Sequence, residues 1–277
     1  SISNVGATIV PVEPNPETFN IDPSKIEEKI TSKTKVIMPV HLFGQSCEMD
    51  KILKIARKYN LYIVEDNAQA HLAKYNSKFT GTFGDINATS FYPSKNLGAI
   101  GEAGCITTDN KKLSDYARNY RNYGSKVKYE NEIIGSNSRI DEIQASILNV
   151  KLDYLKHWTN LRLDIASKYD KILTSNRFIQ VPKKLDLCDH VYHLYVIKTD
   201  KRDELQSFLQ KNGVGTSIHY PIPPHLQKAY NFLGFKNGDY PIAEKLAKQS
   251  LSLPLYPGIK NDSIDYITNL IFKFFKF

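Results

Sequence analysis

The sequence has 277 residues and a mass of 31.6 kDa; 41% of its residues are hydrophobic and its formal net charge is +8. This length and hydrophobic content suit one large domain, or a large and a small one, and they exclude a globally disordered chain. The positive charge would suit nucleic acid or an anionic ligand, but the lysines are spread along the whole chain without a basic run. We therefore predict no nucleic-acid partner.

The three cysteines are far apart, and no CxxC or Cys/His spacing occurs around them (Cys47, Cys105 and Cys188). This pattern predicts neither a disulfide framework nor a metal site, and free thiols fit a reducing cytoplasm. No apolar run is long enough to span a bilayer. We therefore expect a cytoplasmic protein that does not contact a membrane.

The first half of the chain alternates short β-prone runs with helical patterns. Its predicted strands lie at residues 7–12, 35–40, 61–64, 88–92 and 105–108, and its predicted helices at residues 20–31, 47–60 and 111–120. Asp22 and Pro23 are typical of the cap and first position of a helix. We interpret His41, just after a predicted strand, as a turn residue with satisfied hydrogen bonds. Strands and helices that alternate at this spacing indicate an α/β fold with three layers and a mainly parallel sheet.

The second half begins with the longest helical pattern, residues 140–173, which contains no proline or glycine. It predicts one long helix, or a broken pair, joining a large domain at residues 1–150 to a smaller α+β domain at residues 151–277. Beyond it we predict a strand at residues 191–198, helices at residues 203–212 and 243–249, and a closing helix near the C-terminus.

Polar side chains follow two of the predicted strands, at the point where each strand ends. The apolar run at residues 61–64 ends in Glu65 and Asp66. The β-prone run at residues 88–92 is followed by Lys95, in a turn with three glycines behind it (Gly98, Gly101 and Gly104). In open α/β sheets ligands bind outside the carboxyl ends of the strands, so we expect Asp66 and Lys95 to meet there.

A lysine and a carboxylate are the pair that pyridoxal phosphate requires. The lysine forms a Schiff base with the cofactor, and the acid keeps the pyridine nitrogen protonated so that the ring acts as an electron sink. Ser90 would add a hydroxyl group to the cofactor phosphate. For any single lysine, a solvated loop side chain is the commoner interpretation; the carboxylate upstream makes us favour a cofactor site.

Two loop-rich segments hold further candidates. Residues 216–230 are dense in histidine, tyrosine and proline, so His219, Tyr220 and His225 would lie on a rigid loop and contact a sugar or a pyrophosphate. Local packing of these side chains fits the sequence equally well. In residues 120–139, Asn137 fits a turn before a helix cap when it is judged from the sequence alone.

Three stretches together resemble the DegT/DnrJ/StrS family of sugar aminotransferases: VEDNAQAH, GDINATSFYPSKNLGAIGEAG and GSNSRIDEIQAS. They follow the order of the family's motifs at compatible spacing, and the likeness runs along the whole chain. Members of the family are fold-type-I enzymes that depend on pyridoxal phosphate, so the resemblance implies that fold and that cofactor. One departure is Leu72, because the family usually has glycine after the histidine of the first motif.

The resemblance also implies roles for individual residues. Lys95 would hold the cofactor and act as the proton carrier, while Asp66, Gln69 and Ser90 would contact its ring nitrogen, ring hydroxyl and phosphate. Asn137 would reach the cofactor phosphate of a neighbouring subunit, which implies a homodimer with shared active sites. Contacts with the substrate are expected from six residues: Tyr92, Tyr123, Arg139, His219, Tyr220 and His225.

The expected reaction moves an amino group from glutamate to a nucleotide-linked keto-6-deoxy sugar. The likeness is greatest to members that aminate C3 of a dTDP-3-keto-6-deoxyhexose, which implies biosynthesis of amino sugars for polysaccharides such as the lipopolysaccharide O-antigen. Lys95 favours transamination, because dehydratases of the family carry histidine there. Amination at C4 and a non-catalytic regulatory relative are the alternatives. The chain begins part-way into the family pattern, so we expect a large domain that is incomplete at its N-terminus.

Overall fold

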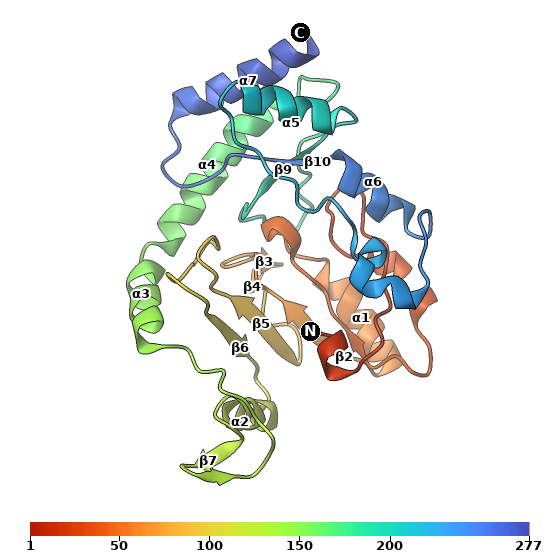
Figure 1. Cartoon of the computed structure of the whole chain (residues 1–277), viewed down its shortest axis with the longest axis vertical. Helices are drawn as coiled ribbons and strands as arrows, with labels where there is room; N and C mark the ends of the chain where they lie inside the picture. Colours follow the sequence, from red (N-terminus) through yellow and green to blue (C-terminus); the bar gives the residue numbers. More distant parts are fainter. Residues whose placement is uncertain (277) are drawn as a thin grey trace. The chain divides into compact units, whose positions relative to one another are not determined.

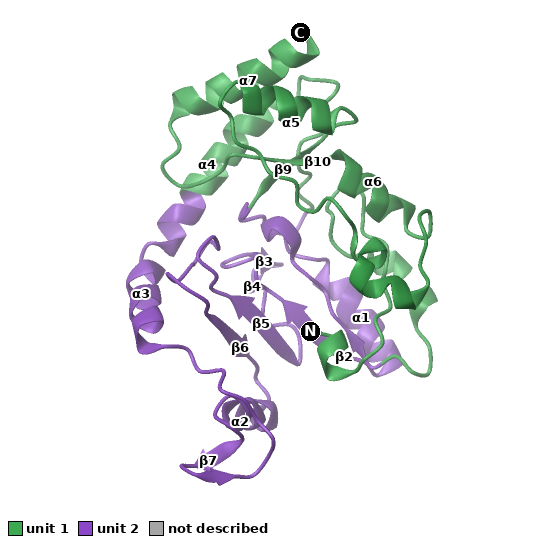
Figure 2. Ribbon diagram, viewed as in Figure 1, with its two compact units in different colours: residues 1–34, 161–185, 194–277 green, residues 35–160, 186–193 purple. Residues whose placement is uncertain are grey.

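The computed structural model describes residues 1–276, and the chain divides into two compact units (Figure 2). Unit 1 contains residues 1–34, 161–185 and 194–277, and unit 2 contains residues 35–160 and 186–193. The division into domains after residue 150 remains a prediction, because compactness divides the chain at other positions. Every residue predicted to bind the cofactor belongs to unit 2.

Unit 2 is built on a four-stranded sheet with the order β1-β2-β5-β6 (Figure 1). Its strands are β1 (Val36–Ile37), β2 (Tyr62–Asp66), β5 (Ile86–Ser90) and β6 (Gly104–Thr107). Strands β1, β2 and β5 run parallel, and β6 pairs antiparallel with β5. The predicted mainly parallel sheet is thereby confirmed, and the carboxyl ends of β2 and β5 lie side by side.

Helix α1 (Met49–Tyr59) connects β1 to β2 and packs against β2. Its buried residues recur at helical spacing, so one apolar face of the helix is turned toward the core (Met49, Ile52, Ile55 and Ala56). Helix α2 (Lys111–Tyr120) begins where the sequence predicted, because the Asn110 side chain caps it by accepting hydrogen bonds from two N–H groups of the first turn.

Two short hairpins complete unit 2. One pairs β3 (Lys74–Tyr75) with β4 (Lys78–Phe79), and the other pairs β7 (Ser125–Val127) with β8 (Glu130–Asn131). The second hairpin belongs to a segment, residues 120–139, that follows α2 and that we call the arm. In Figure 1 the arm lies beyond α2, at the end of unit 2 that carries β6.

The long helical pattern of the second half is a broken pair of helices, α3 (Glu142–Leu152) and α4 (Leu155–Leu173). Unit 1 contains a two-stranded antiparallel sheet of β9 (Tyr195–Lys198) and β10 (Ser250–Leu253). Its remaining helices are α5 (Arg202–Lys211), α6 (Pro241–Gln249) and α7 (Asn261–Phe275). Large side chains from these elements are fully buried and form the core of unit 1 (Tyr169, Tyr195, Leu205, Leu209, Leu251, Ile264 and Ile271).

The first 34 residues differ from the prediction. Residues 7–12 form no strand; Pro11 lies in this run and has no N–H group to donate to a neighbouring strand. Residues 20–31 form two short 3-10 turns, Pro23–Lys25 and Glu27–Lys29, instead of an α-helix. The predicted cap is confirmed, since Asp22 Oδ1 accepts a hydrogen bond from the Ser24 N–H group at 2.9 Å.

This N-terminal segment is held inside unit 1 by its polar contacts. The carboxylate of Glu13 accepts hydrogen bonds from the N–H groups of Ile242 at 2.9 Å and Ala243 at 3.0 Å, in the first turn of α6. A carboxylate at that position satisfies N–H groups that have no partner within the helix. The Tyr240 hydroxyl also donates to the Pro11 carbonyl at 3.2 Å. The extreme N-terminal residues therefore cluster with residues some 230 positions later.

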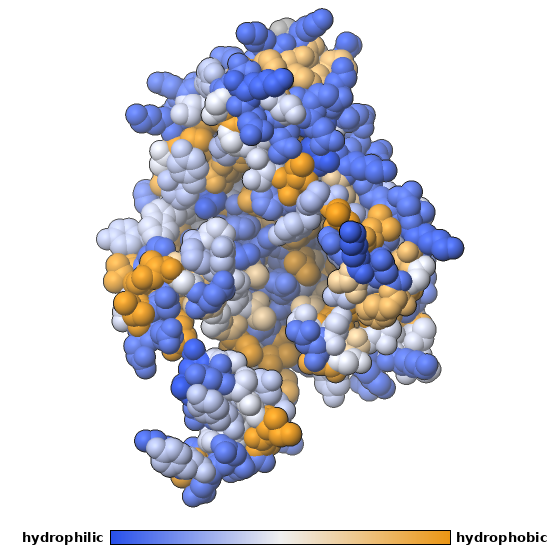
Figure 3. All heavy atoms as spheres, in the orientation of Figure 1, coloured by the Kyte–Doolittle hydropathy of each residue, from blue (hydrophilic) through white to orange (hydrophobic). Residues whose placement is uncertain are grey.

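Large apolar side chains of unit 2 are exposed on α3 and on the arm. They are Ile143, Val150 and Leu152 on α3, and Tyr123, Val127, Tyr129 and Ile134 on the arm. The space-filling view shows hydrophobic side chains gathered over α3 (Figure 3). Apolar groups that gather on a surface in this way mark a site of interaction with another molecule. Among residues 1–276, no helix combines the length and the apolarity needed to cross a membrane.

Candidate active site

Lys95 lies in a tight turn that begins where β5 ends. Its N–H group donates to the Tyr92 carbonyl at 2.8 Å, and the Ala99 N–H group donates back to the Phe91 carbonyl at 2.8 Å. A side chain at Gly98 would place its Cβ 2.4 Å from the Pro93 carbonyl oxygen, so only glycine fits this close approach. The turn holds Lys95 half-buried at the carboxyl end of the strand.

Asp66 is the last residue of β2 and pairs with Ala88 of β5. Its Oδ1 accepts a hydrogen bond from the Ala68 N–H group at 2.9 Å, which fixes the carboxylate beside the turn that follows. Burial lowers the pKa of the Lys95 amine, and the negative charge of Asp66 partly offsets that shift. The structure therefore brings the two predicted groups within electrostatic reach of each other.

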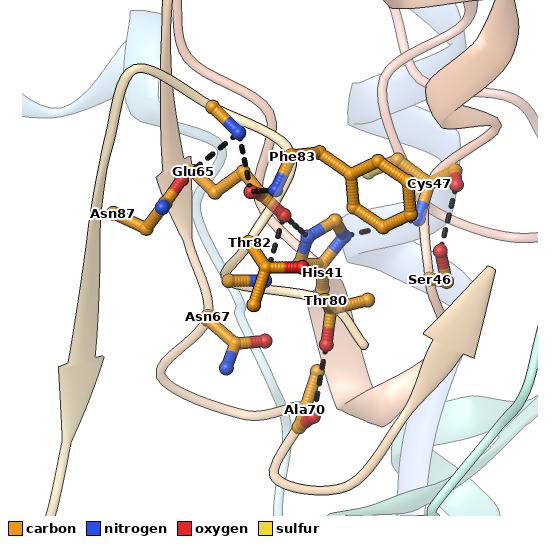
Figure 4. A network of polar contacts seen from close by, with 12 residues as sticks. His41, Ser46, Cys47, Glu65, Asn67, Ala70, Thr80, Thr82, Phe83 and Asn87 are labelled. Atoms are coloured by element: carbon orange, nitrogen blue, oxygen red, sulfur yellow. Dashed lines mark hydrogen bonds and ion pairs between the residues drawn. The ribbon is translucent and has the colours of Figure 1, made fainter. Parts of the chain in front are cut away.

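Glu65 points to the other face of β2, because successive side chains of a strand alternate. Its carboxylate is fully buried and is surrounded by four hydrogen-bond donors (Figure 4). They are His41 Nε2 at 2.8 Å and the N–H groups of Gly81 at 2.8 Å, Phe83 at 2.6 Å and Gly84 at 2.7 Å. Of the two adjacent carboxylates, one anchors the loop after β4 and the other faces Lys95.

The tautomer of His41 follows from its two contacts. Its Nδ1 accepts a hydrogen bond from the Cys47 N–H group at 3.1 Å, so Nε2 carries the hydrogen that Glu65 accepts. Burial alone raises the pKa of Glu65, but the hydrogen bond from His41 and the N–H groups of Gly84 and Gly81 outweigh this effect. The pKa of Glu65 consequently lies below its usual value. The interpretation of His41 as a turn residue with satisfied hydrogen bonds is confirmed.

Gln69 and Ser90 lie on the same two segments as Asp66 and Lys95. Gln69 is buried, and its Oε1 accepts a hydrogen bond from the Phe43 N–H group at 2.6 Å. Ser90 ends β5, and its Oγ accepts a hydrogen bond from the Tyr92 N–H group at 3.2 Å. That contact uses the oxygen as an acceptor and leaves the O–H hydrogen as a donor, as a phosphate ligand would require.

His71 is a neighbour of Lys95 that the sequence did not single out. It is 6% exposed, its ring packs on Phe91 with a centroid distance of 5.8 Å, and neither ring nitrogen makes a hydrogen bond of ordinary geometry within residues 1–276. Burial, together with the positive charge of Lys95, lowers the pKa of His71 to about 4, although the Ser90 main chain opposes the shift. The sequence position of His71, two residues after Gln69, could have marked it as a candidate site residue.

Tyr123, Asn137 and Arg139 gather on the arm. The Arg139 guanidinium lies 5.2 Å from the centre of the Tyr123 ring and donates to Asn122 Oδ1 at 2.7 Å. Asn137 is exposed, and its main chain forms an isolated antiparallel β-bridge with Asn122. The arm and α2 also line a pocket of about 480 Å³ that carries four cationic side chains and one carboxylate (Arg118, Arg121, Lys126, Arg139 and Asp115). This pocket suits an anionic ligand.

The three candidates of the proline-rich loop belong to unit 1. His219 is half-buried, its Nδ1 lies 2.8 Å from Ser252 Oγ, and Tyr220 is exposed. His225 is buried, and its Nε2 lies 3.0 Å from Glu244 Oε1. Burial raises the pKa of Glu244, but the Gly238 N–H group and His225 outweigh it and hold that pKa below its usual value. His225 thus serves a buried contact within unit 1.

A family model described as the DegT/DnrJ/EryC1/StrS aminotransferase family matches residues 1–272. The chain belongs to this family. Enzymes of the DegT/DnrJ/EryC1/StrS family depend on pyridoxal phosphate, and the chain is an aminotransferase of fold type I. The resemblance drawn from the three sequence stretches is therefore confirmed.

Individual relatives and a solved structure support the assignment to the DegT/DnrJ/EryC1/StrS family. The dTDP-3-amino-3,6-dideoxy-alpha-D-galactopyranose transaminase of Aneurinibacillus thermoaerophilus is 47% identical over 271 residues, which are 98% of this chain and 74% of the relative. A pleiotropic regulatory protein of Geobacillus stearothermophilus is 45% identical over 278 residues, 100% of this chain and 75% of the relative. The crystal structure of S. venezuelae DesV in complex with a ketimine intermediate superposes with a TM-score of 0.96 at 39% identity, covering 99% of this chain and 74% of DesV.

The residues present fit the cofactor of the DegT/DnrJ/EryC1/StrS family. An amine and a carboxylate within electrostatic reach match its aldehyde and its ring nitrogen. The hydroxyl group of Ser90 keeps a hydrogen to donate. The imidazole of His71 is also buried beside Lys95, and neither nitrogen makes a hydrogen bond of ordinary geometry within residues 1–276, which leaves room for a ligand as its partner.

Proposed function

We propose that this chain transfers an amino group from glutamate to a keto-sugar carried by a nucleotide, with pyridoxal phosphate held at Lys95. The observation that supports this most directly is the placement of Asp66 at the end of β2 and of Lys95 in the turn after the neighbouring parallel strand β5, within electrostatic reach of each other. Two half-reactions at one site predict ping-pong kinetics. We also propose that the reaction takes place in the cytoplasm.

Pyridoxal phosphate, when bound, supplies a sink for the electrons released at the α-carbon of the amino donor. Asp66 would keep the ring nitrogen protonated, Gln69 would contact the ring hydroxyl, and Ser90 would donate to the phosphate. The Lys95 amine would remove the proton from the donor α-carbon as a base and then, as an acid, deliver it to the cofactor. Burial assists this role, because a lowered pKa increases the neutral fraction of the Lys95 amine near pH 7.

For the acceptor we propose C3 of a dTDP-linked 3-keto-6-deoxyhexose, in the biosynthesis of amino sugars for polysaccharides such as the O-antigen. The 47% identical relative, whose name gives a dTDP-3-amino-3,6-dideoxy sugar, supports this position. The cationic pocket at the arm suits the negative charge of such a nucleotide. Amination at C4 is the alternative, and NMR assignment of the amine-bearing carbon in the product separates the two.

We further propose a homodimer with shared active sites, in which Asn137 binds the cofactor phosphate of the partner subunit. The exposed apolar side chains of α3 and the arm support a contact with a second copy. For the substrate we propose contacts from five of the six predicted residues: Tyr92, Tyr123, Arg139, His219 and Tyr220. His225 is left out, because its imidazole is buried against Glu244.

A non-catalytic regulator with the same fold is the second candidate function, and the name of the Geobacillus stearothermophilus relative favours it. The visible absorption spectrum decides between the two. A chain loaded with pyridoxal phosphate should show a band that glutamate bleaches, and Lys95→Ala should form no lysine-linked band. A wild-type chain that binds the cofactor but does not respond to glutamate would instead support the regulator.

A further inference from the structure

Lys95 is held in place by a segment almost one hundred residues further along the chain. This segment, residues 188–193, belongs to unit 2 and is called the strap here. It runs beside residues 44–46: the Val191 N–H group donates to the Gly44 carbonyl at 2.9 Å, and the Ser46 N–H group donates to the Asp189 carbonyl at 3.1 Å. The two segments approach so closely that a Cβ atom at Gly44 would lie 2.9 Å from the main-chain nitrogen of His193.

The strap binds the Lys95 turn through the side chain of Asn96. This side chain is 6% exposed, and its Nδ2 donates to the Val191 carbonyl at 3.2 Å. Its Oδ1 lies 3.2 Å from His193 Nδ1, and His193 is 8% exposed. Because an amide oxygen can only accept, the hydrogen in this second contact belongs to His193 Nδ1. Both groups of the Asn96 amide are therefore matched, and the amide has one possible orientation.

The strap also touches the segment that carries Asp66 and Gln69. The Val191 side chain is buried in a small apolar cluster with Ala70 and Ala73, directly after Gln69. Phe43, which precedes the strap's partner Gly44, donates its N–H group to Gln69 Oε1 at 2.6 Å. One short segment thus packs on the turn after β2 with its Val191 side chain and hydrogen-bonds the turn after β5 with Val191 and His193.

We propose that Asn96 and His193 are positioning residues that fix Lys95 at the correct distance from Asp66 and Gln69. This inference rests on the proposed function, since it concerns the residue that would hold the cofactor. The pair holds the residue next to Lys95, so its loss frees the turn to shift and displaces the amine, although the lysine itself is unchanged. A shift of about 1 Å in a reacting group lowers rates by up to a hundredfold.

The alternative is that the pair is only a satisfied polar contact of the core, whose loss lowers stability and nothing else. Four variants separate the two accounts. Asn96→Ala removes both contacts, His193→Leu removes one, and His193→Asn restores an N–H donor near the position of Nδ1. Thr268→Val is the matched control: Thr268 is 1% exposed and bonded within α7 of unit 1.

The variants are tested as full chains loaded with pyridoxal phosphate, and the readouts are the pH midpoint of the visible band, the rate of cofactor loading and the melting temperature. For Asn96→Ala and His193→Leu we expect a midpoint shifted by about half a pH unit or more, and loading slowed by roughly tenfold or more. His193→Asn should recover most of both. Thr268→Val should lower the melting temperature and leave the midpoint unchanged.

The proposal is overturned if Asn96→Ala and His193→Leu keep the wild-type midpoint and loading rate while only their melting temperatures fall. Should Asn96→Ala fail to fold, the comparison of His193→Leu with His193→Asn decides, and equal midpoints in those two would overturn it as well. Failure of the proposed function itself would look different, because the wild-type chain would then show no glutamate-sensitive band.

Discussion

Glu65 and Asp66 are neighbours in the sequence, yet the alternation of a strand gives them opposite environments. Glu65 is fully buried and accepts four hydrogen bonds, whereas Asp66 is half-buried and faces the Lys95 amine. The same two residues therefore divide the work of the site. Glu65 stabilises the loops around the site, and under the proposed function Asp66 would contribute its charge to the chemistry.

The substitutions Glu65→Gln and Asp66→Asn should affect different properties, the first stability and the second the reaction with glutamate. Glu65→Gln replaces an acceptor oxygen by an NH₂ group that meets the N–H donors of Gly81 or Gly84, and we expect a loss of about 3–5 kcal/mol in the free energy of unfolding. Asp66→Asn should change that free energy by less than about 1 kcal/mol but abolish the response of the visible band to glutamate. Urea unfolding and absorption titration measure the two effects, and equal destabilisation by both variants would contradict this assignment.

His71 makes stability depend on pH in a defined window. Its pKa is lowered to about 4 in the folded chain, so between the unfolded value near 6.5 and pH 4 the unfolded chain binds a proton that the folded chain does not. Stability is therefore lost as pH falls, by about 2 kcal/mol from this group between pH 7 and pH 5. Urea unfolding of the cofactor-free chain should show this loss, and His71→Phe should reduce it by that amount. An unchanged pH dependence in His71→Phe would contradict the shift.

At the scale of a single turn, Leu72 occupies a backbone conformation that favours glycine. Its φ is +67°, and its side chain packs against the buried cluster of Leu97, Ala99, Leu148 and Leu155. The glycine that the family usually has at this position would relieve strain of about 1 kcal/mol. In this chain the apolar contacts of the Leu72 side chain offset the backbone strain.

At most positions an alanine variant is more stable than a glycine variant, and at Leu72 we expect the opposite order of stability. Leu72→Ala keeps the strained φ and loses the packing, which should lower stability by roughly 1–2 kcal/mol. Leu72→Gly loses the same packing but relieves the strain, so it should be more stable than Leu72→Ala by about 1 kcal/mol. Thermal unfolding of both variants measures the order. An alanine variant as stable as the glycine variant, or more stable, would show that the turn is not strained.

Elements whose formation depends on local signals were predictable from the sequence. Helix α2 follows its Asn110 cap, and β2 and β5 follow their apolar runs, so Asp66 and Lys95 could be placed at neighbouring strand ends. Contacts between distant segments left no such signal. Nothing in the sequence near Lys95 indicates that Val191 and His193 hold its turn, and nothing near residue 13 indicates that its carboxylate caps α6.

At the scale of the whole molecule, the predicted cofactor-binding residues lie on two separate parts of unit 2, so an active site could be built from one chain or from two. Lys95 and Asp66 lie in unit 2 at the sheet, while Asn137 and Arg139 lie on the arm beyond α2. If sites are shared between two copies, a chain with a damaged sheet site and a chain with a damaged arm should complement each other.

Mixing the variants Lys95→Ala and Asn137→Ala tests shared sites directly. Each variant alone should be nearly inactive, and an equal mixture, refolded together, should recover about a quarter of the wild-type activity, since half of the dimers then carry one intact site of two. The control is a mixture of Lys95→Ala with Asp66→Asn, both of which damage the same site and should not complement. No recovery in the first mixture, despite heterodimers detected by mass spectrometry, would place each site within one chain.

The contacts that hold the Lys95 turn also set when it can form during synthesis. The turn is bonded to Gln144 and Lys151 of α3 and to Val191 and His193 of the strap. A nascent chain that ends before Gln144 already contains Asp66, Gln69, Ser90 and Lys95, but none of these four supports. We therefore expect the Lys95 turn to reach its folded geometry only late in synthesis, after the strap has left the ribosome.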